Sequence, residues 1–369
     1  MQATRNEFQQ KLAIMRDLLC QHGADGLLLR RVSSFAWATC GAASYVNTAT
    51  TEGAASLLVT RDDCFLISNN IEAPRMEEEE RLATQGWRFC VAHWTSPMSE
   101  LDRLTLGLRL IADVPFLDAK VIDAEMARLR VNLCPEEGER FRKLGRHCAA
   151  AIDSAARAVK PGMTEMEIAA LLGAEVQKCG VQPIVNLIAT DERIYHYRHP
   201  LPTAKKLEKY AMLVLSGRKY GLVCSISRLV YFGPVPVEVQ QRVDVTAQVN
   251  AALIAYSQPG AVLDEVFKKG QAAYTTGGFP DEWQYHHQGG AVGYEPREIL
   301  GKPEVQNVIV AGQAFAWNPT VAGAKMEDTI LVGTQENELL TSIPGWPVKV
   351  VTVPALNVEV TCPMVLEMD

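Results

Sequence analysis

The sequence predicts an α+β protein of two domains, a smaller α/β domain at residues 1–130 and a larger domain at residues 131–369. The larger domain contains a faint internal repeat. Pro161-Gly162 and Pro259-Gly260 each precede a stretch with helical spacing, and the closing glycines Gly180 and Gly278 follow them at equal distances. Each unit then continues into apolar runs that are typical of strands. Two α+β units of this kind predict a cleft at their pseudo-symmetry axis.

The elements of the smaller domain alternate between helix and strand. Residues 6–22 carry apolar side chains at helical spacing. Short apolar runs bounded by turn residues, which are typical of buried strands, occur at 26–29, 55–60 and 64–68. From Pro135 onward, apolar residues recur every three or four positions as far as Val159, which predicts one long helix at the start of the larger domain.

Composition excludes several classes of protein. The chain has 369 residues, 48% apolar and 21% charged, which is ordinary for a globular protein with a sizeable core. Its formal charge of -7 argues against general nucleic-acid binding. No apolar run is long enough for a transmembrane helix, and the polar residues 1–8 are unlike a secretory signal. Nine scattered cysteines without a C-x-x-C pair argue against a disulfide framework, so we expect a cytoplasmic protein.

Three short motifs near the C-terminus occur in a characteristic order. They are His287-Gln288-Gly289-Gly290, then Trp317-Asn318-Pro319, then Met326-Glu327-Asp328. This order resembles the C-terminal half of the pita-bread family, which includes aminopeptidase P, prolidase and the metal-free creatinase. The resemblance implies a C-terminal pita-bread domain behind a creatinase-type N-terminal domain. It also implies a homodimer in which each N-terminal domain helps to close the partner's cleft.

The metal-binding members of this family use two Asp, one His and two Glu as ligands. The matching positions here hold Leu215 (or Val214, in the other register), Ser225, His287, Asn318 and Glu327. Of the expected ligands, His287 and Glu327 remain. Catalytic zinc sites usually keep three protein ligands. Ser and Leu also leave the repulsion between two close dications uncompensated, so we expect no metal cofactor.

His199 precedes a Pro/Thr turn and then an apolar strand pattern, in the segment Arg198-His199-Pro200-Leu201-Pro202-Thr203. This segment resembles creatinase, in which the matching His is the general acid and base. The resemblance therefore implies the same role for His199. Creatinase-like sites hold a guanidinium with two carboxylates, and the matching positions here are Glu327 and the uncharged Ser227, so creatine is not the expected substrate. We expect structural roles for His196 and His286.

The predicted site has a catalytic and a substrate-binding part. The expected catalytic residues are His199, His287 and Glu327. The expected substrate-binding residues are Ser225, Ser227, Tyr294, Glu298, Trp317 and Asn318. Tyr294 replaces a second family His, and Glu298 is a candidate replacement charge.

These residues predict an enzyme, a metal-independent hydrolase of a C–N bond in a small amide, amidine or peptide-like metabolite. In the expected mechanism, Glu327 holds the positive or N–H-rich part of the substrate, and His287 and Asn318 stabilise the oxyanion. Two alternatives stay open. One is an Xaa-Pro aminopeptidase or dipeptidase with a divalent metal at His287, Asn318 and Glu327. The other is an inert module that binds a peptide or ligand.

Overall fold

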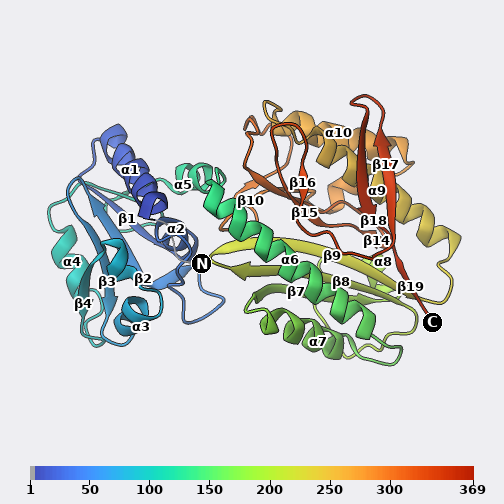
Figure 1. The fold of residues 1–369 in the computed structure, drawn as a ribbon, viewed down its shortest axis with the longest axis horizontal. Coiled ribbons are helices and arrows are strands. Elements are labelled where there is room, and N and C mark those ends of the chain that lie inside the picture. Colours follow the sequence, from blue (N-terminus) through green and yellow to red (C-terminus); the bar gives the residue numbers. More distant parts are fainter. Residues whose placement is uncertain (1–4) are drawn as a thin grey trace. The chain divides into compact units, whose positions relative to one another are not determined.

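The computed structural model describes residues 5–369, and the chain divides into two compact units (Figure 1). One unit comprises the chain up to Arg130 together with Tyr220–Leu222, and the other comprises Val131–Lys219 and Val223–Asp369. Residues 1–4, on which part of the expectation about a signal segment rests, lie outside the described residues. Among the helices that are described, none combines the length and apolar character needed to cross a membrane.

The first unit is built around a six-stranded mixed sheet in the order β4-β3-β2-β1-β5-β6. The strands are β1 (Gly26–Arg31), β2 (Glu52–Thr60), β3 (Cys64–Asn69), β4 (Arg88–Ala92), β5 (Leu110–Ala112) and β6 (Lys120–Val121). The helices are α1 (Arg5–His22), α2 (Val32–Ala38), α3 (Ala73–Glu78), the 3₁₀ turn η1 (Leu82–Gln85), α4 (Ser99–Thr105) and α5 (Asp123–Arg130). The predicted first helix and the three predicted strands are all present, with the strands extended by one to three residues.

The second unit begins with two helices and a sheet in the order β19-β9-β8-β7. The elements are α6 (Pro135–Ala158), α7 (Glu165–Lys178), β7 (Gln182–Thr190), α8 (Arg193–His196), β8 (Tyr210–Lys219), β9 (Leu222–Phe232) and β19 (Leu366–Met368). Helix α7 packs on β7 and α6 packs on β8, so both helices cover one face of this sheet (Figure 1).

The second half of this unit repeats the order of two helices and a sheet. Its helices are α9 (Val237–Tyr256), α10 (Leu263–Thr276) and the 3₁₀ turn η2 (Glu282–Tyr285). Its five-stranded sheet runs β11-β10-β12-β15-β16. The strands of this sheet are β10 (Gly289–Val292), β11 (Ile299–Leu300), β12 (Ala314–Trp317), β15 (Asp328–Leu331) and β16 (Glu338–Leu339). Two separate two-stranded sheets are formed by β13 (Thr320–Val321) with β14 (Ala324–Lys325) and by β17 (Val348–Val353) with β18 (Val358–Pro363).

The sequence signals that predicted the repeat have local causes in the structure. Thr164 caps α7, because its hydroxyl accepts from the Glu167 backbone N–H while the Glu167 carboxylate accepts from the Thr164 backbone N–H. Gly180 and Gly278 both adopt positive φ just beyond a helix end, where a residue without a Cβ is favoured. The apolar faces of α9 and α10 join one core with Phe315, Trp317 and Ile330 of the second sheet.

Helix α6 approaches a neighbouring loop closely at one glycine. A Cβ on Gly145 would lie 2.4 Å from the Leu340 carbonyl oxygen and 2.9 Å from its Cβ. The helix has a second glycine, Gly138, where an added Cβ would meet nothing nearer than 3.7 Å. The two positions therefore separate the effect of close packing from the ordinary preference of a helix for alanine.

We predict that Gly145→Ala lowers the free energy of unfolding by about 1–3 kcal/mol, because the added methyl group overpacks against backbone atoms. Gly138→Ala should be neutral or stabilising by about 0.5–1 kcal/mol, because alanine has the higher helix propensity. Urea denaturation of both variants measures the difference. Equal stability of the two variants would contradict the close contact.

Candidate active site in the second unit

A cavity of about 310 Å³ lies in the second unit, with walls from both of its halves. The first half contributes residues of β7 and β8 and the loop that carries His199, and the second half contributes the loops around β10 and β12–β14. The lining residues are Val185, Leu187, His199, Val214, Ser216, His287, Pro296, Arg297, Asn318, Lys325 and Glu327. The predicted cleft therefore contains all three expected catalytic residues.

The loop that carries His199 is anchored by a buried carboxylate on α7. Glu165 accepts hydrogen bonds from the backbone N–H groups of Thr190 and Thr203, each at 2.9 Å, and from the Thr203 hydroxyl at 2.7 Å. The Arg193 guanidinium also pairs with this carboxylate. Glu165 thus fixes both ends of the 190–203 segment, which places His199 at the rim of the cavity.

The segment that carries His286 and His287 is held by packing that admits no Cβ. After Gln288 come Gly289 and Gly290, where a Cβ would lie 2.1 Å from the Ala316 carbonyl oxygen and 2.2 Å from the Ile299 carbonyl oxygen, respectively. Both glycines have positive φ. The two glycines of the His-x-x-Gly motif thus let β10 pass between its neighbours.

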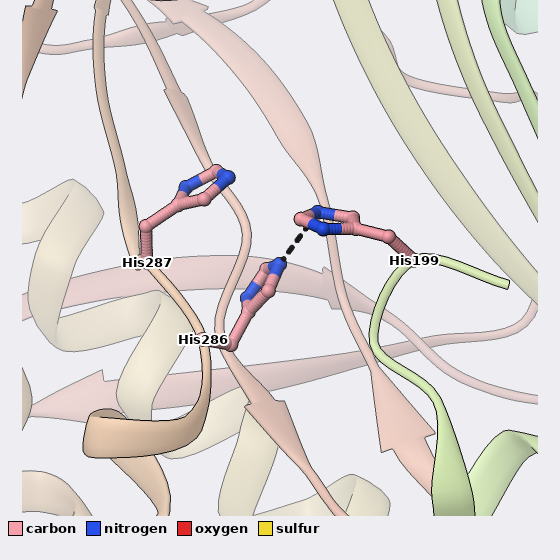
Figure 2. Close-up of side chains that lie close together, drawn as sticks. All are labelled: His199, His286 and His287. Atoms are coloured by element: carbon pink, nitrogen blue, oxygen red, sulfur yellow. Dashed lines mark hydrogen bonds between the residues drawn. The ribbon is translucent and has the colours of Figure 1, made fainter.

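Three imidazoles from these two segments form a cluster, which we call the histidine cluster: His199, His286 and His287 (Figure 2). The Nε2 atoms of His286 and His199 are 3.1 Å apart, and the rings of His286 and His287 stack with centroids 4.6 Å apart. Their ligand nitrogens all lie within 4.8 Å of one another. The ring of His286, for which we expected a structural role, contacts both other members of the cluster.

Each imidazole of the histidine cluster is kept neutral by its surroundings. Desolvation is the largest cause of the lowered pKa of all three rings, and the pKa of His287 is lowered to about 4 by all causes together. The positive charge of Lys325 lowers the pKa of all three further, and Arg297 does so for His199 and His287. Neutral imidazole is the form that accepts a proton from water.

The Glu327 carboxylate is occupied on both oxygens. Arg297 Nη2 donates to Oε1 at 3.0 Å, and the Ser227 hydroxyl donates to Oε2 at 2.8 Å. Burial alone would raise the pKa of Glu327, but Lys325, Arg297 and Ser227 together outweigh it and hold the pKa below its usual value. From the sequence we expected Glu327 to bind a positive group of the substrate. In the structure, the negative charge of Glu327 is already compensated by Arg297.

Asn318 and Lys325 complete the wall. Asn318 is buried, and its Oδ1 has no hydrogen-bond partner among the described residues. Lys325 lies at the end of β14, opposite Thr320 in the short β13–β14 hairpin, and its side chain is 4% exposed. Sequence reasoning missed Lys325 and Arg297, since an isolated lysine or arginine in a loop pattern is normally a surface residue.

Four predicted substrate-binding residues lie behind the wall. Trp317 is fully buried and donates from Nε1 to the Ser257 hydroxyl, while Tyr294 donates to the Glu137 carboxylate on α6. Glu298 accepts from the backbone N–H groups at 294 and 295, so it shapes the loop. Ser225 bonds to Ser216, which lines the cavity. Trp317, Tyr294 and Glu298 are thus placed as supports, because their polar atoms already have protein partners.

The strand geometry also decides between the two registers left open at the first ligand position. Side chains alternate along β8, so Val214 and Ser216 face the cavity while Leu215 faces the opposite side. Val214, rather than Leu215, therefore stands on the cavity wall.

The two α+β halves with a cavity between them are the fold of a pita-bread domain. The model of metallopeptidase family M24 matches residues 139–334, so this chain belongs to that family. The α+β fold class and the resemblance predicted from the sequence are therefore confirmed. The family description favours a peptidase over an enzyme that acts on amidine metabolites, and at the level of the family it favours a divalent metal.

Solved structures of low identity share the fold. A prolidase from Pyrococcus horikoshii OT3 superposes with a TM-score of 0.78 at 17% identity, covering 90% of this chain and 98% of that one. An Xaa-Pro dipeptidase from Bacillus anthracis gives 0.77 at 19% identity, covering 91% and 98%. The N-terminal domain of the FACT complex subunit SPT16 from Cicer arietinum gives 0.68 at 12% identity, covering 92% and 97%.

Curated relatives are described as uncharacterized peptidases. One from Staphylococcus saprophyticus is 26% identical over 60% of this chain and 65% of its own length. Another, from Staphylococcus epidermidis, is 23% identical over 72% of both chains. The match to the first of these relatives thus spans less than two thirds of its length.

The residues around the cavity do not fit the dinuclear metal centre that the family implies. Two close dications need bridging carboxylates, and Glu327 is the one carboxylate among the residues that line the cavity. Both of its oxygens accept protein hydrogen bonds, and Lys325 and Arg297 add positive charge beside it. Among the described residues, the histidine cluster is the grouping in this unit that could hold a single ion, and Glu327 does not join it.

The residue after Glu327 has a different task. Asp328 Oδ1 accepts from Arg228 Nη2 at 2.8 Å and from the Thr341 hydroxyl at 2.7 Å. Both Asp328 and Arg228 are almost completely buried. The two neighbouring acidic residues therefore differ in position: Glu327 lines the cavity, and Asp328 forms a buried ion pair.

We predict that Asp328→Asn lowers the free energy of unfolding by about 3–5 kcal/mol, because it leaves the Arg228 guanidinium buried without an anion. The surface pair of Glu238 and Arg242 provides the control, and Glu238→Gln should change stability by less than about 1 kcal/mol. Chemical denaturation compares the two. A loss as small as that of Glu238→Gln would show that the buried pair is dispensable.

Proposed function

We propose that this protein hydrolyses a C–N bond in a short peptide or peptide-like amide, at the cavity lined by His199, His287, Asn318 and Glu327. The observation that carries the proposal is the meeting of two neutral imidazoles and a buried amide in one cavity of an M24-family fold. The family and its peptidase-named relatives support a peptide bond over an amidine group.

His199 acts as the general base and then as the general acid. As the water oxygen attacks the scissile carbonyl carbon, the neutral His199 ring takes the water proton. The carbonyl oxygen becomes an oxyanion, to which the Asn318 amide and the His287 ring donate hydrogen bonds. When the C–N bond breaks, protonated His199 returns the proton to the departing nitrogen. Glu327, held by Arg297 and Ser227, positions this wall instead of binding a positive substrate group.

Two other functions have a specific observation in their favour. The family description and the histidine cluster support a metallopeptidase with one divalent ion, at that cluster or at His287, Asn318 and Glu327. The same fold occurs in the N-terminal domain of a FACT complex subunit, so a module that binds a peptide or ligand without catalysis stays the second alternative. The homodimer and the cytoplasmic location remain predictions.

We predict that His199→Ala lowers kcat by about 10²–10⁴-fold on dipeptides such as Ala-Pro and Gly-Pro, because a general acid and base contributes that much. His196→Ala is the matched control, since His196 is an exposed residue at the end of α8, and it should keep wild-type turnover. Amine release from each dipeptide measures the rates. Wild-type turnover by His199→Ala would exclude the assigned role, and no turnover of any peptide by the wild-type protein would exclude the proposed function.

The same assignment predicts the pH dependence of turnover. The pKa of His199 lies below its ordinary value of 6.5, chiefly because the ring is desolvated, so the base is neutral at pH 7. Turnover should therefore stay high near neutral pH and fall only below pH 6.5, as His199 takes up a proton. A kcat profile between pH 4 and 8 tests this expectation. An acid limb with a midpoint above 6.5 would point to a different base.

We predict that turnover survives exhaustive dialysis against EDTA, because the cavity carries one compensated carboxylate and two cationic side chains. The measurement combines elemental analysis of protein purified without chelator with assays before and after dialysis. About one equivalent of zinc, manganese or iron per chain, together with loss of activity on its removal, would establish the metallopeptidase alternative.

A further inference from the structure

The cavity wall contains a buried cation that the proposed mechanism has not used. Lys325 is 4% exposed, and it lines the cavity together with His199, His287 and Asn318. No hydrogen bond or ion pair of its side chain exists among the described residues 5–369. A buried ammonium without a partner is costly, so its position calls for a ligand or a function.

The neighbouring carboxylate does not neutralise this ammonium. Burial lowers the pKa of Lys325, and the Glu327 carboxylate opposes this shift only in part. The oxygens of Glu327 are already bonded to Arg297 at 3.0 Å and Ser227 at 2.8 Å. The wall therefore holds two cationic side chains for one anionic one, while the imidazoles are neutral. The other cation nearby, Arg198, is paired with Glu282. An excess positive charge faces the cavity, which suits an anionic oxygen and opposes a metal ion.

The cationic side chains of this cavity differ from the carboxylates that form the metal centre of the family. A divalent ion in a hydrolase serves as a Lewis acid that stabilises charge on the carbonyl oxygen. Here the carboxylates that would hold such an ion are replaced by Val214, Ser225 and Asn318. The ammonium stands in the same cavity and can offer hydrogen-bonded positive charge to that oxygen.

We propose that Lys325 is a catalytic residue whose ammonium group contacts the oxyanion of the tetrahedral intermediate, so that a side chain supplies the positive charge that metal ions supply elsewhere in the family. The proposal rests on the proposed function. In the step itself, water adds to the carbonyl carbon, its proton goes to His199, and the carbonyl electron pair moves onto the oxygen beside Lys325. Collapse then breaks the C–N bond, His199 protonates the nitrogen, and Lys325 keeps its own protons throughout.

The test uses a phosphinic analogue of Gly-Pro, whose tetrahedral P–O⁻ group resembles the oxyanion. Isothermal titration calorimetry of the full chain in EDTA should show that the wild type binds the analogue at least about 100-fold more tightly than Gly-Pro itself, as transition-state analogues do. Lys325→Met should lose this preference, and Lys325→Arg should retain part of it. Lys209→Met, which removes an exposed lysine, is the matched control and should bind like the wild type.

Stability separates a catalytic from a structural role. Lys325→Met replaces a buried unpaired charge with an apolar chain of similar length, so its melting temperature should equal or exceed that of the wild type. A folded Lys325→Met that keeps the analogue preference would overturn the inference. Failure of the wild type to prefer the analogue in EDTA would also overturn it, because a metal or another group would then hold the anion. If no peptide is cleaved, the proposed function fails, whereas Lys325-dependent binding of the analogue still supports the contact.

Discussion

The cavity depends on the contact of β9 with the residues around Glu327, which joins the two halves of the second unit. Ser227 on β9 and Glu327 beside β15 form an isolated antiparallel bridge, with the Ser227 backbone N–H donating to the Glu327 carbonyl at 3.0 Å. The side chains repeat the link, because the Ser227 hydroxyl donates to the Glu327 carboxylate. Together with the hydrogen bonds between Ser225 and Thr329, this pair joins the sheets of both halves, and it holds the ionised carboxylate beside Arg297. Ser227 and Glu327 are thus linked by one backbone hydrogen bond and one side-chain hydrogen bond, which connect the two walls of the cavity.

The protonation state of each titratable group in the cavity is set by its burial and by the charges beside it. Desolvation keeps the imidazoles neutral, and the two cations nearby strengthen that effect. The carboxylate stays ionised because the same cations stabilise it. A site with one base of low pKa and fixed positive charge is organised for reactions that develop negative charge. In the hydrolysis of a peptide bond, that negative charge develops on the carbonyl oxygen, which lies on the acyl side of the cleaved bond.

Local patterns in the sequence sufficed for most of the fold. The Thr164 and Glu167 spacing predicts the start of α7, and the apolar period after Pro135 predicts α6, because both signals depend on neighbours in the chain. His199 and His287 were recognisable because they adjoin turn residues. Lys325 and Arg297 were not, because their burial is created by β-hairpin pairing and loop packing between distant segments. The partners of Trp317 and Tyr294, Ser257 and Glu137, could not be predicted for the same reason, since they lie far away in sequence.

The two glycines of β10 have a consequence for how this cavity tolerates change. The backbone at Gly289 and Gly290 is wedged between Ala316 and Ile299, so the segment that carries His286 and His287 cannot accept a side chain at either glycine. The side chains that line the cavity, in contrast, project from this fixed backbone into the cavity. Such a frame allows donors and charges to be exchanged one at a time without remodelling the main chain. The chemistry of this fold is therefore freer to diverge than its shape.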